Sequence, residues 1–169
     1  KIREEVAFSI FKFSPVAEDL RRIIAYQDLT TNLERIGDMT LNIIRFVREL
    51  PMSDTRLYEV RGLIIQMTDH VTQMVRNAVM SFTNESYETA VEVIGSDEVM
   101  DEMYHSLRAL LCKLFSHVEL QENDVQVLLN LEGVGHNLER CGDSATNIAE
   151  STIYLVKGSD IRHVNDGES

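Results

Sequence analysis

The sequence is poor in the residues that interrupt helices. Only 2 prolines and 8 glycines occur among 169 residues, and the apolar residues recur at spacings of three and four rather than two. This period is typical of helices and leaves little of the chain for β-strands. We therefore expect an all-α fold.

Cysteine, positive charge and long apolar runs are also scarce. The 2 cysteines, Cys112 and Cys141, lack the close spacing of a zinc or redox motif, so we expect two small buried residues in a reducing, cytoplasmic protein. A balance of 16 basic against 28 acidic residues gives a net charge of −12, which disfavours a nucleic-acid partner and favours cations as ligands. No apolar run approaches the roughly 20 residues that span a bilayer, so membrane association is expected only peripherally, through partner proteins.

The few breakers divide the chain into long helices. Ser14 and Pro15 are a typical helix start, and Pro51 ends that helix after Leu50, which leaves residues 1–13 as the end of an earlier helix. Further helices are predicted from about Asp54 to Phe82, from Ser86 to Ser116 and from Glu122 to Lys157, the last with Gly158 as its C-cap.

One acidic motif occurs twice. NLERIGD spans Asn32 to Asp38 and NLERCGD spans Asn137 to Asp143, and 8 of 13 positions are identical between residues 32–44 and 137–149. The offset of 105 residues (137 − 32) indicates duplication of a three-helix unit. The second unit, residues 51–158, is complete and precedes a tail at 159–169. The first, residues 1–50, is expected to lack its first helix and most of its second.

The acids of this motif share the helix face that carries apolar residues. Glu34 and Asp38 are four apart, with Val16, Leu20, Ile23 and Leu41 within about 40° of Glu34, and Glu139 and Asp143 repeat the arrangement. We therefore expect the acids to point inward, where they need arginines or cations to neutralise them. Because Arg35 and Arg140 project about 100° away from the neighbouring glutamates, cations are the better account.

The third predicted helix supplies a second acidic pair, Asp97 and Asp101, on another apolar stripe. Across a three-helix unit this pair can face Glu139 and Asp143, which predicts a site of four carboxylates. The first-copy counterparts of Asp97 and Asp101 fall before Lys1, so the site at Glu34 and Asp38 is expected to be half built.

Enzymatic interpretations find little support in the sequence. Glu102 and His105 form the only E-x-x-H, which a di-iron carboxylate bundle needs twice, and they lie off the apolar stripe. His136 is expected to be a hydrogen-bonded core histidine or a metal ligand. No nucleophile motif or phosphate-binding loop is present. We therefore predict that the protein is not an enzyme.

Four segments together carry a resemblance to a known family: PVAEDLR from Pro15 to Arg21, the two NLER-x-GD motifs, and YLVKGSDIRH ending at His163. On these segments the chain resembles the PhoU family of phosphate-signalling regulators. The resemblance implies tandem three-helix bundles whose acidic motifs bind iron or zinc in some members. The ligand candidates that it implies here are Glu34, Asp38, Asp97, Asp101, Glu139 and Asp143.

The same resemblance implies a negative regulator of the phosphate-starvation response, which links a phosphate ABC transporter to a sensor histidine kinase and commonly forms a homodimer. Two alternatives remain open from the residues: a metal-dependent helical-bundle enzyme, and a structural helical module whose acids are neutralised without metal.

Overall fold

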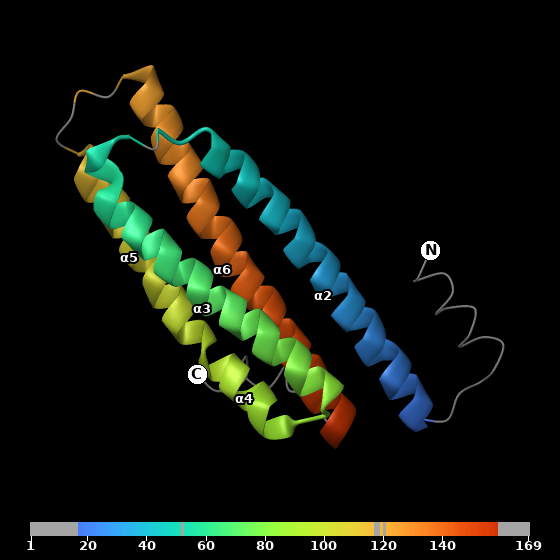
Figure 1. Cartoon of the computed structure of the whole chain (residues 1–169). Helices are drawn as coiled ribbons and strands as arrows, with labels where there is room; N and C mark the ends of the chain where they lie inside the picture. The colour runs from blue at the N-terminus through green and yellow to red at the C-terminus, as the bar shows by residue number, and fades with distance from the viewer. Residues whose placement is uncertain (1–16, 52, 117–118, 120, 159–169) are drawn as a thin grey trace, which may run out of the picture.

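A computed structural model describes residues 17–51, 53–116, 119 and 121–158. These residues form α2 (Ala17–Arg48), a 3₁₀ turn η1 (Thr55–Leu57), α3 (Tyr58–Thr83), α4 (Tyr87–Gly95), α5 (Asp97–Phe115) and α6 (Glu122–Lys157), arranged as a bundle (Figure 1). The described residues contain no strand, and the predicted all-α fold is confirmed. Within the same residues, no helix is both long and apolar enough to cross a membrane.

Local capping explains two of the predicted helix ends. The Asp54 carboxylate accepts the Arg56 backbone N–H at 2.9 Å and so caps η1, which leads into α3. Gly158 adopts the left-handed conformation with φ of 69°, and its N–H donates to the Tyr154 carbonyl at 2.9 Å, as expected for a glycine C-cap. The helix start predicted at Ser14 and Pro15 lies outside the described residues, as do the predicted segments 1–13 and 159–169.

The prediction of one continuous helix from Ser86 to Ser116 is wrong. The structure has two helices there, α4 and α5, separated at Ser96. The Ser86 side chain accepts the Thr89 N–H and caps α4, but the Ser96 side chain makes no equivalent cap for α5. Gly95 directly precedes the break, and the Ser96 hydroxyl donates back to the Glu92 carbonyl at 2.8 Å, a bond that often bends helices.

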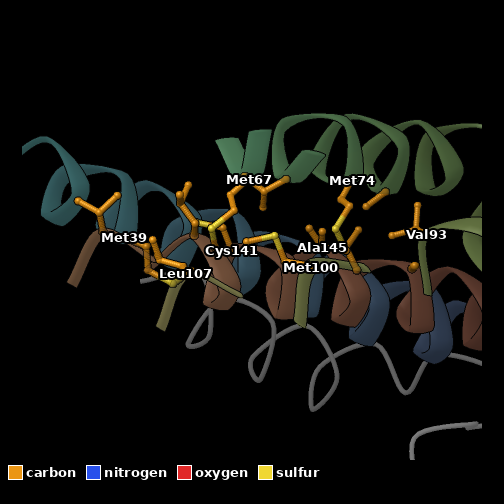
Figure 2. Close-up of a cluster of buried hydrophobic side chains, with 14 of the residues drawn as sticks. Met39, Met67, Met74, Val93, Met100, Leu107, Cys141 and Ala145 are labelled. Carbon is orange, nitrogen blue, oxygen red and sulfur yellow. The ribbon is translucent and has the colours of Figure 1, made fainter. Parts of the chain in front are cut away.

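Helix α6 is the centre of the bundle, since α2, α3, α4 and α5 all pack against it. The core between α3, α5 and α6 is rich in methionine: Figure 2 shows Met67, Met74 and Met100 gathered with Cys141 and Ala145. These three methionines are buried, where their unbranched side chains can fill irregular gaps. Not every methionine is buried, since Met80 is 49% exposed.

The cysteines have different environments. Cys141 is buried in the core, and burial raises the pKa of its thiol to about 11. Cys112 is exposed on α5, so the prediction that it is buried is wrong. Its helical position turns it away from the stripe of Leu107, Leu111 and Phe115, which carries the packing of that helix.

Helix α2 is the described part of the first unit, and it lies antiparallel to α6 (Figure 1). Ser151 Oγ donates to Asp28 Oδ2 at 3.4 Å near one end of the pair, and Asn130 Nδ2 donates to Glu49 Oε2 at 3.3 Å near the other. The helices that carry the two copies of the motif are therefore held together by hydrogen bonds near both ends of their contact. The division into units at residues 50 and 51 remains a prediction from the repeat.

Candidate metal site

Four of the predicted ligands come together where the start of α5 packs against the middle of α6. Asp97 and Asp101 occupy the first two turns of α5, while Glu139 and Asp143 lie one turn apart on α6. Burial raises the pKa of the half-buried Asp97 carboxyl, and the charges of Asp143 and Asp101 raise it further. The carboxylates predicted to meet across the bundle are thus close enough to repel one another.

The pKa values of Glu139 and Asp143, on α6, are raised by the same burial and repulsion. The pKa of Glu139 is raised by burial first and by Asp143 second, with smaller contributions from Asp101 and Asp97, and the charge of His136 opposes them. The pKa of Asp143 is raised by burial and then by Asp101, against the lowering effect of Arg140 and His136. Both helices therefore hold carboxylates whose ionised forms are disfavoured.

One oxygen of this group is buried without a hydrogen-bond partner. It is Glu139 Oε2, and the nearest cationic group, His136 Nδ1, lies 3.6 Å away. A buried carboxylate oxygen that accepts no hydrogen bond destabilises the folded protein unless a cation compensates it. This orphaned oxygen is the observation that fits a bound metal ion.

Gly142 lies where α5 packs closely on α6. A Cβ atom on Gly142 would lie 3.2 Å from Met100 Cγ and 3.6 Å from Asp97 Oδ1, so a larger residue would need the Met100 side chain to shift by a few tenths of an ångström. The nearby Thr146 hydroxyl lowers the pKa of Asp97 and so favours its ionised form. This hydroxyl is buried and makes no hydrogen bond of good geometry.

The donor set fits a hard cation better than it fits a protein partner. Among the described residues no arginine or lysine forms an ion pair with any of the four carboxylates, and carboxylate oxygens are the ligands that divalent cations prefer. As the side chains are placed, no three His, Cys, Asp or Glu residues of the described chain are arranged to hold a metal ion. Metal binding therefore needs rotation of side chains, which the exposed Asp101 and Asp143 are free to make.

The first copy of the motif is placed differently. Glu34 and Asp38 are both exposed on α2, and Asp143 is exposed on α6, so the prediction that the motif acids point inward is wrong for these three. The preceding motif residue shows why: Leu33 is 40% exposed, whereas its counterpart Leu138 is 3% exposed. Among the described helices, α6 packs against α2, α3, α4 and α5, whereas α2 packs mainly against α6. Glu34 and Asp38 remain predicted ligands that the described residues do not complete.

The histidines also differ from expectation. His136 is exposed beside Glu139 rather than hydrogen-bonded in the core. His105 and Glu102 are exposed, as expected for a pair off the apolar stripe. His70 was not singled out from the sequence, yet its charge acts on Asp97. No pattern around His70 signals this, because its neighbour Asp97 belongs to another helix.

The asparagine that begins each copy of the motif was not singled out from the sequence. Asn32 and Asn137 are 6% and 7% exposed, and each donates its side-chain amide to the carbonyl four residues earlier, on Asp28 and Gly133. Their identity in both copies was the available signal. Both hydrogen bonds lie within the asparagine's own helix.

The fold and the site define a class: duplicated helical bundles with paired acidic motifs on their helices. The family model of the PhoU domain matches residues 1–47 and 64–152. The chain therefore belongs to the PhoU family. The resemblance noted in the motifs is confirmed.

Curated relatives agree with this assignment. A phosphate-specific transport system accessory protein PhoU homologue of Pseudomonas putida is 33% identical over 166 residues, which are 96% of this chain and 62% of that relative. A homologue of the same name from a Burkholderia species is 28% identical over 97% of this chain and 69% of its own length. The chain thus spans about two thirds of the length of these relatives.

Solved structures share the fold. The crystal structure of PhoU from Pseudomonas aeruginosa matches with a TM-score of 0.80 and 31% identity, covering 93% of this chain and 73% of that one. A phosphate transport system regulatory protein PhoU from Streptococcus pneumoniae matches with a TM-score of 0.77 at 23% identity, covering 95% and 76%. The second likeness supports the fold alone.

The crowded carboxylates predict an unusual pH dependence. Because the raised pKa values make the folded state bind protons more tightly than the unfolded state, stability falls as pH rises from about 4 through the raised values. Asp143→Asn removes one of these charges. In a chelating buffer we expect its free energy of unfolding to exceed that of the wild type by an amount that grows between pH 4 and pH 7, measured by urea denaturation.

The matched control is Asp38→Asn, the equivalent change in the exposed first copy, for which we expect a difference within about 0.5 kcal/mol at every pH. If Asp143→Asn were as stable as the wild type at pH 7, the repulsion described here would not exist.

Proposed function

We propose that this protein is a non-catalytic regulator of phosphate uptake and phosphate-starvation signalling, and that it binds a metal ion through Asp97, Asp101, Glu139 and Asp143. The observation that carries the proposal is the complete acidic cluster of the second copy in a chain of the PhoU family. The relatives named above are accessory proteins of phosphate-specific transport, which supports the phosphate side of the proposal.

The metal ion would supply positive charge to a site that repels its own carboxylates. Carboxylate oxygens of Asp97 and Asp101 would hold it from α5, and those of Glu139 and Asp143 from α6, so that binding ties the two helices together. Iron and zinc are the metals suggested by the family resemblance. In this proposal the metal is regulatory or structural, and the surface of the bundle serves recognition of partners rather than turnover of a substrate.

The proposed partners follow from the family. We propose a cytoplasmic homodimer that acts as an adaptor between the ATPase of a phosphate ABC transporter and a sensor histidine kinase, and that keeps the kinase response low when phosphate is plentiful. A regulator of this kind reaches the membrane through the transporter and needs no membrane span of its own.

Metal content tests the site. Protein purified without chelator is analysed for iron, zinc and manganese as the wild type, as Glu139→Gln/Asp143→Asn, and as the matched first-copy control Glu34→Gln/Asp38→Asn. We expect bound metal in the wild type and the control, and loss of at least about 90% of it in the second-copy variant, because each ligand lost weakens binding by about tenfold or more. Metal content insensitive to the second-copy changes would remove the metal site from the proposal.

Expression of phosphate-responsive genes tests the regulatory role. In a host that lacks its own PhoU-family regulator, a phosphate-responsive reporter is high in rich medium, and we expect this full chain to lower it several-fold. The second-copy variant is expected to restore repression less well than the first-copy control. A reporter unchanged by the wild-type chain, with the protein present in soluble form, would contradict the regulatory proposal even if metal binding held.

A further inference from the structure

The break between α4 and α5 occurs at a residue whose backbone remains helical. Ser96 has φ of −79° and ψ of −13°, and its N–H is shared between the carbonyls of Glu92 at 3.1 Å and Val93 at 3.0 Å. The next bond of the ladder is weak, because the Met100 N–H lies 3.4 Å from the Ser96 carbonyl oxygen, against about 2.9 Å for a good N–H···O bond. The ladder is therefore weakened at the Ser96 carbonyl.

A side chain from another helix is hydrogen-bonded to that carbonyl. His70, on α3, places Nε2 2.9 Å from the Ser96 oxygen. Because a carbonyl only accepts hydrogen bonds, the imidazole must carry its proton on Nε2. A side chain that enters the i→i−4 ladder is a recognised cause of helix kinks. The Ser96 carbonyl thus accepts from both His70 and Met100, and the bond from His70 is the shorter one.

The break lies directly before a predicted metal ligand. Asp97 follows Ser96 in the chain and is the first residue of α5, where backbone N–H groups without helical partners favour a carboxylate. Its Oδ1 comes to 3.6 Å from the position of a Cβ on Gly142. An unbroken helix through Ser96 would carry Asp97 on a different path past α6.

We propose that His70 is a positioning residue for the acidic site: by holding the Ser96 carbonyl, it breaks the helix between α4 and α5 and fixes Asp97 against Gly142, beside Asp143. This role rests on the metal site of the proposed function. It adds α3 to a site whose ligands come from α5 and α6, through a residue that no acidic motif contains.

Three substitutions of His70 distinguish the effect of losing the hydrogen bond from the effect of losing the volume of the imidazole. His70→Gln can place an amide N–H close to the position of Nε2, so it should keep the bond to Ser96. His70→Leu cannot donate, and His70→Asn is too short to reach, so the latter provides the same test if the leucine variant fails to fold. The matched control is His105→Leu, because His105 Nδ1 also lies on a backbone carbonyl, that of Asp101 at 2.8 Å, but within its own helix.

The first measurement is Mn²⁺ affinity of the full chain, from free Mn²⁺ by electron paramagnetic resonance. Substitutions that disturb the residues supporting metal ligands weaken binding by about 10–100-fold, and we expect such a loss for His70→Leu and His70→Asn. His70→Gln and His105→Leu should stay within about 3-fold of the wild type. Wild-type affinity in His70→Leu, or a loss in His70→Gln as large as in His70→Leu, would overturn the positioning role.

The second measurement does not depend on metal. Hydrogen exchange of the Met100 amide is followed by NMR in the metal-free chain, and we expect slower exchange in His70→Leu because the Ser96 carbonyl then accepts from Met100 alone and the two can approach to ordinary hydrogen-bond distance. Unchanged Met100 exchange would overturn the account of the break, whatever the metal affinity. A wild-type chain that binds no Mn²⁺ would remove the metal site and with it this role of His70, while the exchange result would still show whether His70 breaks the helix.

Discussion

Helix α6 has to pack against every other described helix at once, and the placement of the acidic site depends on this constraint. The helix contacts α2 along one side and α3, α4 and α5 along the others, so much of its surface is buried in apolar contact or beside small residues. Glu139 and Asp143 lie where α5 meets α6, half-buried and exposed respectively. Their partial burial raises the pKa of both carboxyl groups, while their remaining exposure allows an ion to reach them from solvent.

The two copies of the motif show that surroundings, rather than sequence, decide what a carboxylate does. Glu34 and Glu139 occupy the same position of the same motif, yet only Glu139 is packed beside acids of another helix. The glycines differ in the same way, since a Cβ on Gly37 would meet no described atom within 4 Å, whereas one on Gly142 would meet Met100 and Asp97. The motif contributes two of the clustered carboxylates, and α5 contributes the other two.

The helices and the grouping of the second-copy carboxylates could be predicted because both depend on local pattern. The spacing of apolar residues, the cap at Asp54 and the glycine at 158 define helix ends, and the four-residue spacing of Asp97 and Asp101 on an apolar stripe places them where they can face Glu139 and Asp143. The orientation of Glu34 and Asp38 could not be predicted, because a helical wheel places residues on a face without showing whether anything covers that face. The Gly95–Ser96 pair was a local signal for the break between α4 and α5, but the hydrogen bond that His70, 26 residues earlier, makes to the Ser96 carbonyl leaves no local signal.

The central claim is that α5 and α6 hold mutually repelling carboxylates whose repulsion a cation relieves. Carboxyl ¹³C NMR of the full chain, titrated with acid in the absence and presence of Mg²⁺, measures the pKa of each aspartate and glutamate in the site directly. The account predicts that Asp97, Glu139 and Asp143 titrate above the ordinary range of about 4 without Mg²⁺, and that saturating Mg²⁺ lowers all three pKa values. Ordinary pKa values in the metal-free protein that Mg²⁺ leaves unchanged would contradict it.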